Sequence, residues 1–237
     1  MRYILIPDVH GRDFWRKHVE HRNPDDIVVF LGDYVDPYPD EKITNKAALQ
    51  GLKDIIELKK SDPEHIILLL GNHDLGYMTR DFCNARHWYK GHDQLHEIFF
   101  DNIDLFILSY VAEGFLISHA GVYPHWLEQC GIDLKGFDDF NDQLHEPKTY
   151  DSVVDKLYYI DRYRGGWFPV GSPVWADIRC ALRYDNLDMN QIVGHTQLIE
   201  GPLQINKMIC IDCRRVFILE DGRLKNPDGT DVNIIKQ

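Results

Sequence analysis

The sequence predicts an α/β protein in which mixed parallel and antiparallel sheets form a sandwich with helices outside. Short apolar runs rich in β-branched residues recur along the chain and have the length and boundaries of buried strands. In the first third these runs alternate with helical patterns, which predicts parallel strands. Later runs follow one another across short turns, which predicts antiparallel pairs.

The first third of the chain accounts for the parallel part of the prediction. Strands are predicted at 3–6, 27–31 and 66–70, since each run is too short for a buried helix and is bounded by turn residues. Helices are predicted at 12–21 and 45–60, and Thr44 can cap the second of them. Right-handed crossovers would then place the three strands side by side in one sheet.

The remainder of the chain is predicted to add antiparallel strands. The runs 105–111 and 115–118 flank Ala112-Glu113-Gly114, which reads as a hairpin turn. Further strands are expected near 191–193, 207–211 and 216–219, so the second half of the core should be antiparallel. The segment 123–174 is polar, aromatic and irregular, and is expected to form a lid or a helical cap. The sequence contains no segment with the composition of a linker between domains. Residues 1–237 are therefore predicted to be a single domain that carries this insertion.

The composition of the chain argues against several classes of function. The formal net charge of −12 argues against a protein that binds the backbone of DNA or RNA, which requires a basic surface. No apolar stretch approaches the ~20 residues of a membrane helix, and the first apolar run is too short for a signal peptide. The five cysteines are scattered and form no disulfide framework. We therefore expect a cytoplasmic protein without a membrane or nucleic-acid partner.

Five of the apolar runs end at residue types that bind metal ions. The polar residues at these ends are Asp8, His10, Asp33, Asn72, His73, His119 and His195. Loops at strand ends hold ligands rigidly, so these side chains are candidates for one shared site. Oxygen and imidazole donors without thiolate suit Mn²⁺, Fe or Zn²⁺ and disfavour a structural zinc site. Two such ions ~3.5–4 Å apart can hold a hydroxide and clamp a phosphoryl group.

The same strand ends resemble the signature blocks of the calcineurin-like metallophosphoesterases. The blocks occur in that family's order over about residues 3–196: Asp8-Val9-His10-Gly11, Gly32-Asp33-Tyr34-Val35-Asp36, Gly71-Asn72-His73-Asp74, Ser118-His119-Ala120-Gly121 and Gly194-His195-Thr196. Within the family the chain is most similar to the phosphoprotein phosphatase branch, which includes small bacterial and phage phosphatases and symmetrical diadenosine tetraphosphatases. The resemblance implies a four-layer α/β/β/α sandwich.

The resemblance also implies roles for the motif residues. One divalent ion, most often Mn²⁺ with Fe or Zn²⁺ as alternatives, would bind the side chains of Asp8, His10 and Asp33. The second ion would share Asp33 and add those of Asn72, His119 and His195. His73 would be the general acid that protonates the leaving oxygen, and Asp36 would orient it through a hydrogen bond. The alternative for His73 is a purely structural residue.

The chain departs from the phosphatase branch beside the second block. That branch usually follows the aspartate with Arg-Gly, and the arginine contacts the substrate phosphate, whereas here Asp36 is followed by Pro37-Tyr38-Pro39. The segment 172–179 resembles one that carries a second phosphate-binding arginine in several branches, which makes Arg179 the candidate phosphate ligand. An exposed structural arginine is the alternative. Weaker candidates are Arg12, Arg162 and Arg164.

The expected activity is hydrolysis of phosphomonoesters, on a protein or a small molecule, by direct attack of a metal-bridging hydroxide. One alternative is hydrolysis of dinucleoside polyphosphates such as diadenosine tetraphosphate. An alternative of another class is a metal-retaining scaffold with weak or no catalysis, which the missing arginine would favour. His73 and Asp36 argue against a scaffold, because a purely structural metal site needs neither of them.

Overall fold

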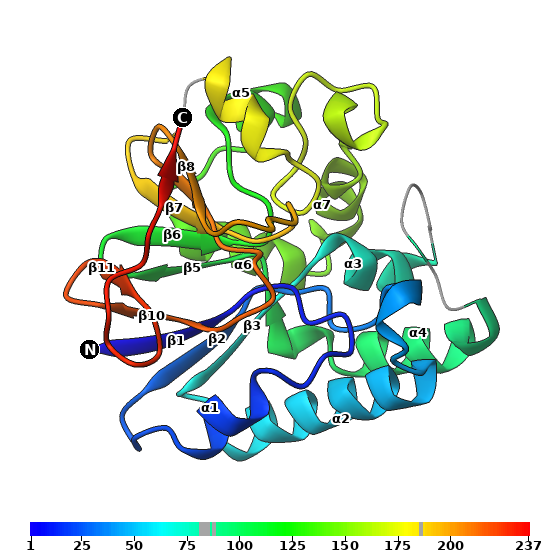
Figure 1. Ribbon diagram of the computed structural model, residues 1–237. Coiled ribbons are helices and arrows are strands. Elements are labelled where there is room, and N and C mark those ends of the chain that lie inside the picture. The colour runs from blue at the N-terminus through cyan, green and yellow to red at the C-terminus, as the bar shows by residue number, and fades with distance from the viewer. Residues whose placement is uncertain (81–85, 87–88, 185–186) are drawn as a thin grey trace. The chain divides into compact units, whose positions relative to one another are not determined.

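The computed structural model describes residues 1–80, 86, 89–184 and 187–237 of the chain. The chain forms two compact units, and each is built around one six-stranded sheet (Figure 1). The first unit comprises residues 1–106 and 214–231, and the second comprises residues 107–213 and 232–237. Both sheets are mixed and both units carry helices, as predicted for the α/β class.

The sheet of the first unit has the strand order β11-β10-β1-β2-β3-β4. Its centre is parallel, as predicted, and consists of β1 (Arg2–Ile6), β2 (Ile27–Phe30) and β3 (Ile66–Leu69). β10 (Phe217–Glu220) pairs with β1 in the antiparallel direction and with β11 (Arg223–Lys225) on its other side. The edge strand is β4 (Phe106–Ile107).

Helices α1 (Arg16–Glu20) and α2 (Asn45–Ser61) lie together on one face of this sheet (Figure 1). Thr44 caps α2 as predicted, because its Oγ1 accepts a hydrogen bond of 3.1 Å from the Ala47 amide. The apolar stripe of α2 is buried, which explains why this pattern folds as a helix. α1 begins four residues later than predicted, since a turn in which the Arg12 amide bonds to the Val9 carbonyl precedes it.

Two further helices of the first unit, α3 (Asn72–Thr79) and α4 (His92–Asp101), pack against each other. Short 3₁₀ turns occupy Pro39–Glu41, Tyr89–Gly91 and Ile103–Leu105. Neither α3 nor α4 was predicted. Only two residues separate β3 from α3, so the Asn72-His73 motif forms the first turn of a helix.

The sheet of the second unit has the strand order β12-β8-β9-β7-β6-β5. β5 (Ser109–Ala112) and β6 (Phe115–Ser118) form the predicted hairpin, in which Ala112 pairs with Phe115. Glu113 and Gly114 form its turn with positive φ angles of 51° and 79°, and these suit the twist of a two-residue hairpin. The remaining strands are β7 (Asn190–Val193), β8 (Leu203–Ile205), β9 (Met208–Cys210) and β12 (Ile235–Lys236).

Two details of the predicted second half are wrong. β6, β7 and β9 are parallel to one another, because the long connections between them return the chain to the same end of the sheet. The run 105–111 is not one strand, since β4 ends at Ile107 and β5 begins at Ser109. Asn141 Oδ1 accepts hydrogen bonds from the Leu108 and Ser109 amides at 2.9 and 3.1 Å, and so satisfies the backbone where the strand breaks.

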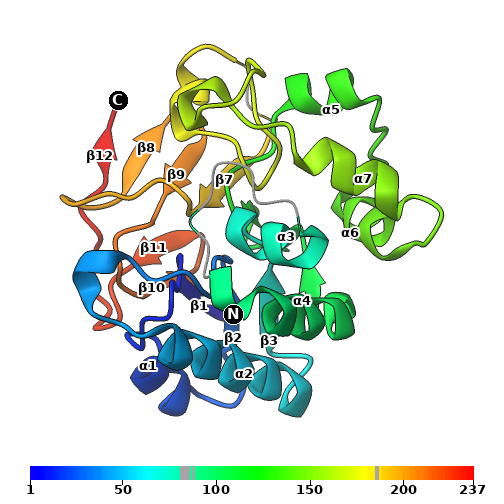
Figure 2. The same ribbon diagram turned by 90° about the vertical axis from the view of Figure 1, so that its right-hand side faces the viewer.

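The segment 123–174 contains three helices that lie together in Figure 2: α5 (Pro124–Cys130), α6 (Phe137–His145) and α7 (Tyr150–Leu157). Trp126 and Phe140 are fully buried among them, with ring centroids 5.7 Å apart. Short 3₁₀ turns follow at Arg162–Arg164 and Ile178–Leu182. Two aromatic residues of this segment thus pack between its helices, whereas Trp167 is 96% exposed.

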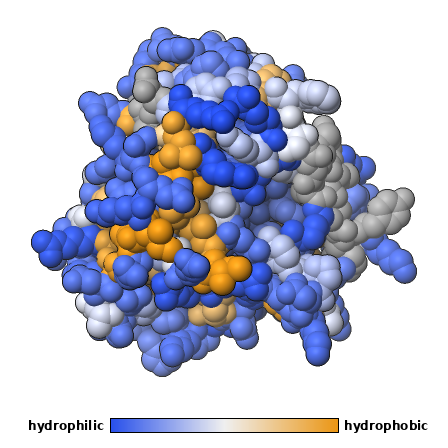
Figure 3. Space-filling model, turned by 45° about the horizontal axis from the view of Figure 1, so that its top comes forward, coloured by the Kyte–Doolittle hydropathy of each residue, from blue (hydrophilic) through white to orange (hydrophobic). Residues whose placement is uncertain are grey.

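The face of the molecule drawn in Figure 3 is mostly hydrophilic, as expected for a chain with 27% charged residues, and carries a smaller apolar area. Within the described residues, no helix combines the length and the apolar character that crossing a membrane requires.

Candidate metal centre

The loops that follow β1 and β2 run side by side and carry three of the predicted ligands. The His10 amide donates to the Asp33 carbonyl at 2.7 Å, and the Gly11 amide donates to the Tyr34 carbonyl at 2.9 Å. Asp8, His10 and Asp33 are all at most 2% exposed. The structure therefore brings together polar side chains that are 25 residues apart in sequence, because parallel neighbouring strands end at the same edge of the sheet.

Asp74 joins the start of α3 to these loops. Its Oδ2 accepts hydrogen bonds from the amides of Asp33 at 2.7 Å and Gly71 at 2.9 Å, and its Oδ1 accepts one from Tyr34 at 3.1 Å. Gly71 is required here, since a Cβ on it would lie 2.3 Å from Asp33 Oδ1. The Asn72-His73 turn is thereby held against Asp33, whose Oδ1 accepts from the His73 amide at 3.0 Å.

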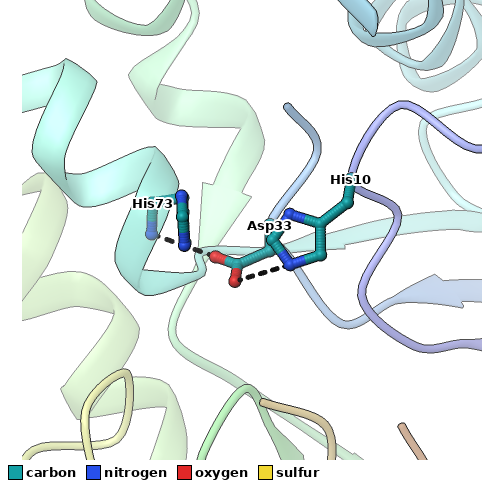
Figure 4. A group of neighbouring side chains, drawn as sticks. All are labelled: His10, Asp33 and His73. Atoms are coloured by element: carbon teal, nitrogen blue, oxygen red, sulfur yellow. Dashed lines mark hydrogen bonds and ion pairs between the residues drawn. The ribbon is translucent and has the colours of Figure 1, made fainter. Parts of the chain in front are cut away.

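The side chains of His10, Asp33 and His73 form the centre of this cluster (Figure 4). One ligand atom from each lies within 4.8 Å of the others, and His10 Nε2 is 3.5 Å from Asp33 Oδ2. His10 Nδ1 is 2.9 Å from the Val35 carbonyl, so Nδ1 carries the proton and Nε2 presents its lone pair toward Asp33. Outer-sphere hydrogen bonds of this kind orient imidazole ligands for metal ions.

The electrostatics of the cluster also favour a cation. Burial raises the pKa of Asp33 well above its usual range; the charge of His73 opposes this shift, while Asp8 and Asp74 add to it. The pKa of His10 is well below its usual value, because burial and the charge of His73 both disfavour a proton on it. Buried carboxylates beside neutral imidazole are a donor set that fits a divalent metal ion.

The backbone is strained where these side chains converge. His10, Asp33 and Asp36 have φ angles of +45°, +53° and +60°, in the left-handed region that few residues other than glycine adopt. In the second unit His195 has a φ of +64°. Such conformations cost free energy and cluster at functional sites, where the surrounding hydrogen bonds hold them.

His73 is paired with Asp36 as the sequence predicts. His73 Nδ1 lies 2.7 Å from Asp36 Oδ2, and both residues are at most 6% exposed. Burial by itself lowers the pKa of His73, but the nearby carboxylates of Asp33 and Asp36 outweigh it, so the pKa is raised. The raised pKa favours the protonated imidazole, which is the form that a general acid requires.

In the second unit the two predicted histidines lie next to each other. His119 follows β6 and His195 follows β7, which are parallel neighbours with Ser118 opposite Val193. The Gly194 amide donates to the His119 carbonyl at 2.8 Å, and His119 Nε2 lies 3.1 Å from His195 Nδ1. The structure thus forms a second pair of imidazole donors at adjacent strand ends.

Arg179 is held by a carboxylate of its own segment. Its Nε and Nη2 donate to the two oxygens of Asp177 at 2.7 and 2.9 Å, and its guanidinium lies over the Tyr163 ring at 4.4 Å. Arg164 shares the same carboxylate, at 2.9 Å from its Nε, and its Nη2 contacts the Thr196 hydroxyl beside His195. Of these two arginines, Arg164 is the one with a contact to the His195 loop.

Sequence reasoning missed two residues of the first unit. Arg86 Nη2 donates to the Asp36 carbonyl at 3.2 Å, its guanidinium lies over the Tyr38 ring at 3.5 Å, and its charge contributes to lowering the pKa of His10. No motif marks this arginine. Tyr77 donates to Asp36 Oδ1 at 2.5 Å, and its position one helical turn after His73 is the signal that could have found it.

Comparison with known proteins agrees with this geometry. A family model described as calcineurin-like phosphoesterase matches residues 1–198. The chain belongs to this family. This calcineurin-like phosphoesterase is accordingly a metal-dependent hydrolase of phosphoesters that uses divalent ions, and its buried His and Asp cluster supplies candidate ligands for them.

Solved structures share the fold of this phosphoesterase at low sequence identity. A mutant of a cold-active protein tyrosine phosphatase is 18% identical, with a TM-score of 0.64, over 94% of this chain and 76% of the other. A protein serine/threonine phosphatase from Saccharomyces cerevisiae is also 18% identical, with a TM-score of 0.54, over 92% of this chain and 72% of the other. At this identity the likeness establishes the shared fold.

Proposed function

We propose that this phosphoesterase hydrolyses phosphomonoesters, on a protein or a small molecule. The observation that carries the proposal is the His73–Asp36 pair, which lies beside the His10–Asp33 cluster. A proton donor is needed where a poor leaving group, such as a serine or sugar alkoxide, departs from phosphorus. A scaffold that only retained metal would have no use for a buried imidazole with a raised pKa.

The proposed metal ligands are the six side chains that the resemblance assigns. Asp8, His10 and Asp33 would hold one ion; Asp33, Asn72, His119 and His195 would hold the other. Mn²⁺ is the proposed native ion, because a mixed set of oxygen and imidazole donors suits it. When bound, the ions supply positive charge to the phosphoryl oxygens and an activated water. The protein's own contribution is to fix the donors and to protonate the leaving oxygen from His73.

Arg86 is proposed as a second candidate ligand of the substrate phosphate, besides Arg179. It hydrogen-bonds to the carbonyl of Asp36, the residue after which the phosphatase branch carries its arginine. Its Nε is buried and has no hydrogen-bond partner among the described residues, so a phosphate oxygen could accept from it. Arg179 is half exposed and already paired with Asp177, so it would have to divide its donors between that carboxylate and a substrate phosphate.

The proposal is tested by a substrate screen with the metal-supplemented protein. p-Nitrophenyl phosphate, its bis-ester, a phosphopeptide and diadenosine tetraphosphate are compared by kcat/KM, with Asp33→Asn as the control for contaminating activity. Hydrolysis of the monoesters in preference to the bis-ester and the dinucleotide supports the proposal. A preference for diadenosine tetraphosphate would replace it with a dinucleoside polyphosphate hydrolase.

A further inference from the structure

A cavity of about 730 Å³ in the first unit lies outside the metal cluster and has no role in the proposed reaction. Gly11 and Arg12, the two residues that follow His10, form part of its wall. The rest of the wall comes from the turn before α2, from the first turns of α2 itself, and from Arg214. The cavity is therefore built by segments of one unit that are distant in sequence.

The wall of this cavity is basic, although the protein as a whole is acidic. Four cationic side chains line it: Arg12, Arg16, Lys42 and Arg214. Two lining residues, Asp13 and Glu41, are acidic, so the wall has a formal charge of about +2 in a chain of net charge −12. A local excess of positive charge on an acidic protein is a condition for attracting an anion.

Glu41 binds two of these cations and leaves one donor of Arg12 unsatisfied. Its carboxylate lies 2.9 Å from Arg12 Nε and 2.8 Å from Arg214 Nη1. Arg12 is 9% exposed, and its Nη1 donates to the Asp8 carbonyl at 3.1 Å. Its buried Nη2 has no hydrogen-bond partner within the described part of the chain. A buried guanidinium N–H without an acceptor is costly, and an anion oxygen would satisfy it.

The N-terminus of α2 adds to the positive potential. Thr44, which caps the helix, and Ala47 both line the cavity. This helix has 17 residues, and no acidic side chain occupies its first turn. The Ala47 amide already donates to Thr44, but the dipole of the helix still favours a negative group in the cavity. Gly11 allows the loop after β1 to lie close to α2, since a Cβ on Gly11 would lie 2.6 Å from Ala48 Cβ.

We propose that this cavity binds a phosphate group other than the one that is hydrolysed. Arg12 and Arg214 would donate from one side, Lys42 would add charge, and the first turn of α2 would face the anion. The site is distinct from the metal cluster but shares its loop, because Arg12 is bonded to the backbone of Asp8. Binding there does not depend on the proposed phosphomonoesterase activity.

The site is tested first by location. Crystals of the full chain, purified with its metal, are soaked in sodium tungstate, whose anion mimics phosphate and scatters anomalously. We expect an anomalous peak between Arg12, Arg214 and the start of α2, in addition to any peak at the metal centre. Absence of a peak in the cavity would overturn the proposal.

Affinity is tested by calorimetric titration of the full chain with inorganic phosphate after chelation, so that metal does not contribute. Arg214→Gln should weaken binding by about threefold to tenfold, since the variant loses one partly exposed cation. Glu41→Gln should tighten it, because a competing carboxylate is removed. Arg223→Gln, an exposed arginine outside the cavity wall, is the matched control and should have no effect. Binding that responds equally to Arg214→Gln and Arg223→Gln would contradict the assignment.

Kinetics distinguish the two sources of the phosphate group. If it belongs to the substrate, Arg214→Gln should lower kcat/KM for a sugar bisphosphate by the same threefold to tenfold while leaving the sugar monophosphate unchanged. If the ligand is free phosphate, both substrates should respond equally and the calorimetric effect should persist. Calorimetry measures phosphate binding without requiring turnover. A protein without phosphatase activity would therefore refute the proposed function, while binding of phosphate in this cavity could still be measured.

Discussion

The carboxylate of Asp36 is held from two sides, and this arrangement explains how His73 can act. One oxygen lies 2.7 Å from His73 Nδ1, and the other accepts the Tyr77 hydroxyl at 2.5 Å. A carboxylate fixed in this way keeps the imidazole in one orientation, with Nε2 as the atom that can release a proton. The catalytic role proposed for His73 and the positioning role that we infer for Tyr77 can be separated by experiment.

His73→Ala should lower turnover by about 10²–10⁴ on an alkyl phosphate, because the leaving alkoxide then departs without a proton. The loss should be much smaller for p-nitrophenyl phosphate, whose leaving group is stable as an anion. Metal content, measured by mass spectrometry, should be unchanged, whereas in Asp33→Asn it should fall. Loss of metal from His73→Ala would show that His73 is a ligand instead.

Tyr77→Phe should preserve the fold and lower kcat by about threefold to tenfold, since one hydrogen bond to Asp36 is lost. Without that donor the negative charge on Asp36 is less stabilised. The carboxylate should then favour a protonated His73 more strongly and raise the pKa of His73 further. The alkaline limb of the kcat profile should therefore move to higher pH. A variant with lower kcat and an unmoved limb would indicate a merely structural tyrosine.

Arg86→Gln and Arg179→Ala compare the two arginines proposed to hold phosphate. Loss of a charge-assisted hydrogen bond to phosphate should raise KM by about one order of magnitude with little change in kcat. We expect the larger effect at Arg86, whose guanidinium contacts the Asp36 backbone and whose Nε is buried. A phosphate inhibition constant unchanged in Arg86→Gln would remove this residue from the site.

At the scale of elements, the short turn Ile178–Leu182 is organised by one buried carboxylate. Asp177 caps it by accepting from the Arg179 amide at 2.9 Å, and also binds the side chains of Arg179 and Arg164. Burial alone would raise the pKa of Asp177, but these partners outweigh it and the pKa is lowered. The ion pairs therefore connect this turn to the 162–164 turn and, through Arg164, to the loop of His195.

Asp177→Asn should lower the free energy of unfolding at pH 7 by about 1–3 kcal/mol, because two arginines lose their shared carboxylate. Since the folded pKa lies below the unfolded value of ~3.9, the stabilisation is present above that pH and is lost as the pH falls through the folded pKa. The difference between variant and wild type should therefore shrink in acid. Urea denaturation at pH 7 and pH 3 measures it.

Asp188→Asn is the matched control for this measurement. Asp188 also pairs with a cation, Lys207, but it is fully exposed, so solvent screens the pair. Its removal should change stability much less at either pH. An equal loss in the two variants would mean that burial of Asp177 contributes nothing to the strength of its ion pairs.

For the molecule as a whole, metal binding should be linked to stability as well as to activity. The cluster around Asp33 gathers buried carboxylates whose repulsion a cation would relieve. Chelation should abolish activity and lower Tm, and Mn²⁺ should restore both better than Mg²⁺, whose octahedral preference suits imidazole poorly. Asp33→Asn should show no Mn²⁺-dependent rise in Tm. Full activity in excess chelator, after verified metal removal, would exclude a metal mechanism.

The sequence alone was sufficient to identify the family, the α/β class and the strand ends that carry the candidate ligands. Those inferences rest on local signals, because a short β-branched run followed by Gly and Asp or His reads as a strand and its loop wherever it occurs. The pairing of His73 with Asp36 was also predictable, since both residues belong to motifs of the family. Roles of the motif residues beyond this geometry stay predictions.

Only the tertiary structure decided which residues support those motifs. Arg86 and Asp74 meet the loops of Asp36 and Asp33 through contacts between segments about 40 or more residues apart, and no local pattern encodes which atoms they contact. The basic cavity likewise depends on Arg214 returning beside Glu41 across most of the chain. The sequence determines which polar side chains follow each strand, because the hydrophobic pattern that marks a strand is local. Folding decides which charges face one another, because burial and long-range packing set their distances.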